Sequence, residues 1–134
     1  LDALEWGARA VPSENGGFLQ VSGLTYEIHT GVASSAEKDE NGMFTRVSGE
    51  YRVKNVMVGG QPLELDKTYT LASHNYMLLG HGDGYTMFDG CEVLGEDMMV
   101  DNQVLITYIT TTLGGVVGEQ YANPYGDGRI VAVE

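Results

Sequence analysis

Two aromatic residues directly follow glycine-containing segments, and their types and spacing suit the binding of a flat ring. Phe18 comes after Gly16 and Gly17, and Tyr85 ends the run GHGDGY over residues 80–85. Glycine opens backbone conformations that other residues avoid, so such a run serves either a tight connection or the close approach of a ligand. Two aromatic side chains held in this way can form the walls of a slot, because stacking on a base stabilises binding by ~1–3 kcal/mol.

Two polar residues near Tyr85 in the sequence could complete such a site. Asp89 can accept hydrogen bonds from ribose hydroxyls or from a base N–H, and Asn75 can both donate to and accept from the edge of a base. The ordinary alternative for each aromatic residue is packing in the core or at its rim. From the residues alone, both interpretations stay open.

Other kinds of site find little support. The histidines, His29, His74 and His81, show no spacing typical of metal ligands, and the acidic run 37–42 lacks the ligand pattern of a calcium loop. No serine lies in a nucleophile motif, and no lysine or arginine stands beside the glycine run to make it a phosphate-binding loop. We therefore expect no metal site and no catalytic group in this chain.

The composition excludes several classes of protein. The chain has 134 residues, of which 43% are hydrophobic, and this fits a single domain with a real core. Its 19 acidic residues against 7 basic ones give a net charge of −12, which argues against a nucleic acid polymer as partner. No apolar run approaches the ~20 residues of a membrane span. The single Cys91 excludes an internal disulfide.

Local patterns predict an α+β fold in which a twisted, mainly antiparallel β-sheet packs with helices. Helices are expected over residues 1–10 and 101–113, ended by Pro12 and by Gly114-Gly115. Strands are expected over 18–29, 43–58, 68–72 and 129–133, with an exposed loop over 30–42 and a hairpin turn at 59–60.

The first of these strands has a change of pattern that bears on the candidate site. Leu19 and Val21 form the apolar set before Gly23, and the opposite positions form it afterwards, which predicts a bulge or sharp twist at the glycine. If Leu19 and Val21 face the core, strand alternation turns Phe18 to the other side.

Four motifs together resemble the C-terminal domain of the 5'-nucleotidase family: GGFLQVSGLTYEI, KTYTLASHNYML, GDGYTMF and GRIVAV. They come in the family's order and span most of the chain, and LDALEWG resembles the helix before the first motif. The family includes UDP-sugar hydrolases, 2',3'-cyclic-nucleotide phosphodiesterase/3'-nucleotidases and surface ecto-nucleotidases.

The resemblance implies roles for individual residues. Phe18 and Tyr85 would sandwich the nucleobase, Asp89 would contact the ribose, and Asn75 occupies a position of the family's ATND(F/Y) motif. One residue departs from the pattern, because His81 stands where the family has a glycine. This change predicts either an altered loop or an added polar contact to the ligand.

The resemblance also implies a larger parent protein. In the family, an N-terminal metallophosphatase domain holds two divalent metal ions, and a GGIR motif supplies phosphate-binding arginines; this sequence contains neither. We therefore expect residues 1–134 to form the C-terminal part of a nucleoside-binding domain that hydrolyses nothing alone. We expect it in a periplasmic, cell-wall-associated or extracellular hydrolase.

The expected partners are a nucleoside or nucleotide, the N-terminal metallophosphatase domain and, through unpaired strand edges, a second copy of the chain. Two alternatives from other classes stay open. The chain could be a cell-surface carbohydrate-binding or adhesion module, or a structural module of a larger secreted protein.

Overall fold

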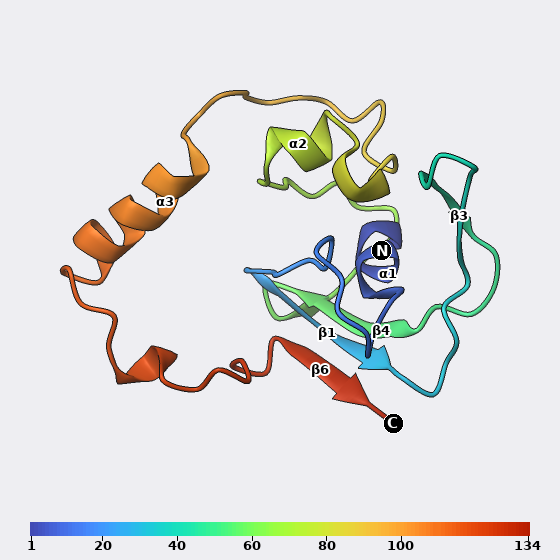
Figure 1. Ribbon diagram of the computed structural model, residues 1–134, viewed down its shortest axis with the longest axis horizontal. Helices are drawn as coiled ribbons and strands as arrows, with labels where there is room; N and C mark the ends of the chain where they lie inside the picture. The colour runs from blue at the N-terminus through green and yellow to red at the C-terminus, as the bar shows by residue number, and fades with distance from the viewer. The chain divides into compact units, whose positions relative to one another are not determined.

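The computed structural model describes residues 1–134 and divides the chain into two compact units (Figure 1). Unit 1 contains Leu1–Asp89 together with Gly128–Glu134, and unit 2 contains residues 90–127. Helices occur beside a mainly antiparallel sheet, which confirms the expected α+β class. That the whole chain forms one domain stays a prediction.

The larger sheet of unit 1 joins segments from both ends of the chain. Its strand order is β5-β4-β1-β6, and these strands span Gln61–Pro62, Val53–Val58, Leu24–His29 and Ile130–Val133. β1 runs antiparallel to β4 and parallel to β6. The predicted hairpin joins β4 to β5, and Gly59 and Gly60 adopt the positive φ values, 57° and 78°, that a tight hairpin turn favours.

Helix α1 (Asp2–Ala8) contributes to both core clusters of unit 1. The first core cluster consists of Leu4, Ala8, Tyr26, Ile28 and Val53. The second core cluster consists of Trp6, Phe44 and Tyr85. The alternation after Gly23 predicted the buried face of β1, and this face is confirmed because both Tyr26 and Ile28 are buried.

Two buried charged residues fasten α1 and the segment after it to β4. The carboxylate of Glu5 accepts a hydrogen bond from the backbone N–H of Val53 at 2.9 Å. The guanidinium of Arg52 donates to the carbonyl oxygens of Ala8 at 3.2 Å and Val11 at 2.9 Å. Each bond gives a buried charged group a partner and so lowers the cost of burying it, and together they fix the start of the segment that leads to Phe18.

A smaller two-stranded sheet corrects the prediction of an exposed loop over residues 30–42, because part of that stretch forms a strand. β2 (Ala36–Lys38) pairs antiparallel with β3 (Phe44–Val47). The turn between them is held by the Asp39 carboxylate, which accepts hydrogen bonds from the N–H groups of Asn41 and Met43, each at 2.9 Å. A side chain that bonds its own backbone in this way makes a polar stretch a stable turn.

One predicted strand does not form, and another is shorter than expected. Residues 68–72 belong to no strand, because no strand of either sheet runs beside them. Residues 18–22 are also outside the sheet, and β1 begins only after Gly23, whose φ is 77°. Without strand alternation, Phe18, Leu19 and Val21 all pack against the first core cluster, so the expected opposite orientation of Phe18 is wrong.

Two short helical elements follow in unit 1, α2 (Asn75–Leu78) and the 3-10 turn η1 (Gly82–Gly84). In unit 2 the predicted helix is confirmed: α3 (Asp101–Thr107) continues into a π-helical turn, η2 (Tyr108–Thr112), and a 3-10 turn, η3 (Glu119–Tyr121), lies further on. No residue of unit 2 is buried. None of the helices has the length and hydropathy that crossing a membrane requires.

Candidate functional site

The two glycine-containing segments singled out from the sequence are in direct contact. The hydroxyl of Tyr85 donates a buried hydrogen bond to the carbonyl oxygen of Gly17 at 2.6 Å. A Cβ atom added at Gly17 would lie 2.9 Å from Cβ of Asp83, closer than real side chains approach. The missing side chain at Gly17 therefore lets the loop before Phe18 lie against the turn before Tyr85.

Tyr85 itself lies inside unit 1. Its side chain has 0% exposure, and its ring stacks on Phe88 with a centroid distance of 6.4 Å and an interplanar angle of 16°. Burial raises the pKa of the Tyr85 hydroxyl well above its usual range. Tyr85 is one of the two aromatic residues expected to form a slot, but in the structure its ring has no face open to a ligand.

Phe18 is half-buried and lies at the edge of a shallow hollow. The hollow is lined by Val11, Ser13, Glu14, Asn15, Gly16, Phe18 and Gln20. Asn15 shapes this edge: its Oδ1 accepts a hydrogen bond from the N–H of Gly17 at 3.2 Å, and its carbonyl oxygen accepts one from the N–H of Phe18 at 3.0 Å. An asparagine before a glycine pair is a known turn signal, but Asn15 was not among the candidate site residues.

Asp89 and His81 form an exposed pair, with the Nε2 atom of His81 2.5 Å from the Oδ1 atom of Asp89. His81 adopts the left-handed conformation, φ 54°, at the position where the family motif has a glycine. The loop thus keeps a conformation that glycine favours, and the imidazole engages the carboxylate expected to contact a ribose.

Asn75 is exposed at the start of α2. The residue after it, Tyr76, connects this helix to the glycine run over residues 80–85. The ring of Tyr76 lies over Gly82, where an added Cβ atom would be only 2.1 Å from a ring carbon. The structure thus brings Asn75, Tyr85 and Asp89 onto neighbouring elements. Ligand contacts by Phe18, Asn75, Tyr85 and Asp89 stay predictions.

Two charged residues that the sequence did not single out also lie at these loops. The exposed Asp83 has φ 54°, and its carbonyl oxygen accepts a hydrogen bond from Nε1 of Trp6 at 2.9 Å. The guanidinium carbon of Arg9 lies 3.7 Å from the centroid of the Trp6 ring, and partial burial lowers the pKa of Arg9 while Tyr85 and Asp83 oppose that shift. Local sequence does not predict this arrangement, because both Arg9 and Asp83 contact Trp6, and Asp83 lies 77 positions away from it in the chain.

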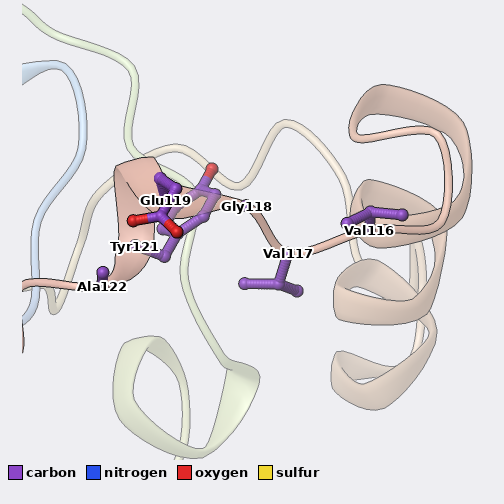
Figure 2. A pocket seen from close by; sticks show the side chains of 6 residues that line it. All are labelled: Val116, Val117, Gly118, Glu119, Tyr121 and Ala122. Atoms are coloured by element: carbon purple, nitrogen blue, oxygen red, sulfur yellow. The ribbon is translucent and has the colours of Figure 1, made fainter.

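Two further features that could form a site are a metal-ligating cluster and a second hollow. No group of three or more His, Cys, Asp or Glu side chains is arranged to hold a metal ion. A second hollow, in unit 2, is lined by a single stretch between Val116 and Ala122 (Figure 2). Because Glu119 is the one charged side chain that lines it, this hollow offers little chemistry for recognising a ligand.

The family is decided by a comparison of the sequence with protein families. The model described as "5'-nucleotidase, C-terminal domain" matches residues 1–90. The chain belongs to this family. The matched region of the 5'-nucleotidase C-terminal domain contains Phe18, Asn75, Tyr85 and Asp89, and it ends one residue after the first segment of unit 1.

A curated relative agrees with this membership. Over 57 residues the chain is 42% identical to Protein UshA of Yersinia enterocolitica serotype O:8 / biotype 1B, strain NCTC 13174 / 8081. The aligned part covers 42% of this chain and 10% of the relative, so the chain spans only a small part of that protein's length. No solved structure matches the chain. The assignment to the 5'-nucleotidase C-terminal domain family therefore rests on sequence similarity.

Proposed function

We propose that this 5'-nucleotidase C-terminal domain binds the nucleoside part of a nucleotide for a hydrolase of which it forms a portion. The observation that carries the proposal is the contact between the two glycine-containing loops, fastened by the bond from Tyr85 to Gly17. This contact places Phe18 at the border between core and solvent, beside a hollow with polar groups. A half-exposed ring of this kind stacks on a base while neighbouring polar atoms serve its edge.

In this proposal Phe18 provides the stacking surface, and the exposed Asn75 and Asp89 supply polar contacts. Tyr85 holds the loop before Phe18 through its hydrogen bond to Gly17. The His81 imidazole engages Asp89, and a ribose hydroxyl would share the carboxylate with it. Because a carboxylate has two oxygen atoms with several acceptor positions, one partner does not exhaust its capacity.

The chemical step is assigned to another domain of the parent protein. Two divalent metal ions held there would activate water and stabilise the transition state of phosphoester hydrolysis. The present chain would position the substrate, since binding energy from the non-reacting base can orient the phosphate. We also propose that the parent acts in nucleotide catabolism outside the cytoplasm, as the family resemblance implies.

The proposal is tested by titrating the chain with adenosine, uridine and their 5'-monophosphates. Trp6, the single tryptophan, reports on the site by fluorescence because its Nε1 atom bonds to the loop carbonyl of Asp83. We expect saturable binding, weakened in Phe18→Ala by about 1–3 kcal/mol.

The matched control is Tyr125→Ala, which removes an aromatic ring that is 95% exposed in unit 2. This variant should bind as the unaltered chain does. Equal binding by Phe18→Ala, or saturation by free sugars but not by nucleosides, would overturn the proposal in favour of a carbohydrate-binding module. Real phosphatase turnover by this chain alone would contradict the assignment of the chemistry to another domain.

A further inference from the structure

The hydroxyl of Tyr85 donates a direct hydrogen bond to the carbonyl oxygen of Gly17, in the loop over residues 13–18 that ends at Phe18. The bond is 2.6 Å long and buried, and it joins residues 68 positions apart. Asn15 bonds to Gly17 and Phe18 within the loop, but those bonds fix only the local shape of the turn. The position of the turn against the core depends on a partner outside it.

Tyr85 is itself held firmly enough to serve as that partner. Its ring packs with Trp6 and Phe44 in the second core cluster, and it stacks on Phe88. The turn before it is tied to α1 through the bond from Trp6 to the carbonyl oxygen of Asp83. A side chain with its ring packed on several sides has little freedom to move its hydroxyl.

Helix α1 leaves room for this hydroxyl by means of a glycine. A Cβ atom added at Gly7 would lie 2.9 Å from the hydroxyl oxygen of Tyr85 and 3.2 Å from Cγ of Leu19. Glycine inside a helix is unfavourable compared with alanine. The space that a side chain at Gly7 would fill is thus occupied by the Tyr85 hydroxyl and by Leu19, the residue that follows Phe18.

We propose that Tyr85 is a positioning residue, which sets the affinity for the nucleoside by holding Gly17 and thereby the ring of Phe18. This inference rests on the proposed function, and it gives Tyr85 a role other than stacking on the base. The hydroxyl acts through the backbone of the loop and touches no ligand. Its loss leaves the ring packing of the core in place while the Phe18 loop gains freedom.

The test compares two variants that each remove one tyrosine hydroxyl. Tyr85→Phe loses the bond to Gly17, and the control Tyr51→Phe loses a bond of the same length, 2.6 Å, to the carboxylate of Asp2 on α1. We expect Tyr85→Phe to raise the nucleoside dissociation constant about three- to tenfold, the range of one hydrogen bond. Tyr51→Phe should leave it unchanged.

Two further measurements separate positioning from general stability. Hydrogen exchange at the amide of Phe18 should accelerate in Tyr85→Phe and not in Tyr51→Phe, even when both lose similar stability. In the Phe18→Ala background, Tyr85→Phe should have no further effect on affinity, because the ring that it positions is gone. Gly7→Ala crowds the same hydroxyl from the helix and should weaken binding in the same direction.

The outcomes distinguish this inference from the function on which it rests. If Phe18→Ala weakens binding but Tyr85→Phe and Gly7→Ala do not, the positioning role is refuted and the proposed function survives. If Phe18→Ala leaves binding unchanged, both the positioning role of Tyr85 and the proposed function are refuted. Equal and additive losses from Tyr85→Phe with and without Phe18 would also refute positioning.

Discussion

Units 1 and 2 use their apolar residues in opposite ways. Unit 1 encloses two core clusters, with the ring of Trp6 only 1% exposed and that of Tyr85 0% exposed. Unit 2 has no buried residue, and many of its large apolar side chains face solvent, for example Leu94 at 73% and Val100 at 68% exposure. Apolar composition alone therefore does not make a core; the chain must also bring elements from distant positions together.

Charge and family membership follow the same division. Residues 90–127 contain aspartate and glutamate but no lysine, arginine or histidine. The family match covers residues 1–90, which includes all the candidate site residues. In unit 1, by contrast, arginine takes part in the framework, as the bonds from Arg52 to the segment after α1 show.

Hydrogen exchange is expected to show the largest difference between units 1 and 2. The backbone amides of β1, paired with strands on both sides, should be protected by several orders of magnitude more than those of α3. A short helix without buried contacts opens easily in water. The measurement is exchange followed by mass spectrometry on the whole chain, and equal protection of β1 and α3 would show that unit 2 is as stable as unit 1.

A pair of alanine substitutions measures the same contrast as free energy. Trp6→Ala removes a buried ring and its bond to Asp83, so the free energy of unfolding should fall by about 3–5 kcal/mol. Leu105→Ala removes a side chain that is 60% exposed on α3 and should change it by less than about 0.5 kcal/mol. Urea unfolding followed by far-UV circular dichroism gives both values. A large loss in Leu105→Ala would mean that α3 is buried in solution.

The sequence predicted those parts of the fold that local signals determine. The hairpin at Gly59-Gly60, the buried face of β1 after Gly23 and the helix that begins at Asp101 each depend on neighbouring residues, and all are present. The strand expected over 68–72 had the right residue types, but strands need a partner, and none is beside it. Local propensity does not reveal whether such a partner exists.

The environment of Tyr85 was not accessible from local sequence. A tyrosine after a glycine run fits a binding loop and a buried anchor equally well, and Trp6 and Phe44, which surround it, lie far away in the chain. The contact of the two glycine loops was expected in outline from the family motifs. The hydrogen bond to Gly17, the bonds that Asn15 makes within its turn and the pairing of His81 with Asp89 required the structure.

Glycine substitutions test how closely the elements of unit 1 pack, and their expected effect on stability is smaller. Gly84 has φ 83°, and an added Cβ atom would lie 2.7 Å from the carbonyl oxygen of Gly42 and 2.9 Å from the Trp6 ring. Gly84→Ala should therefore lower the free energy of unfolding by about 2–3 kcal/mol. Gly23→Ala is the control, since its φ is similar, 77°, but nothing lies within 4 Å; it should cost about 1 kcal/mol. Equal losses would show that backbone strain, and not close packing, decides both.

Alkaline pH should weaken unit 1 while leaving its stability near neutral pH untouched. Burial raises the pKa of Tyr26 from 10.0 to about 12, and the hydrogen bond to Asp2, followed by burial, raises that of Tyr51 to about 12 as well. A raised pKa means that the folded state favours the neutral hydroxyl. The resulting stability is complete below pH 10, the unfolded value, and is lost as the pH rises through about 12.

Urea unfolding between pH 8 and pH 12 would measure this loss, with hydrogen exchange at β1 to locate it in unit 1. Tyr51→Phe has no hydroxyl to ionise at that position, so its stability should decline less steeply over the same range. It begins from a lower value, because it lacks the bond to Asp2. The tyrosines of unit 2 are exposed, Tyr125 at 95%. A steep loss that persists unchanged in Tyr51→Phe would assign the alkaline transition to Tyr26 and Tyr85, inside the two core clusters.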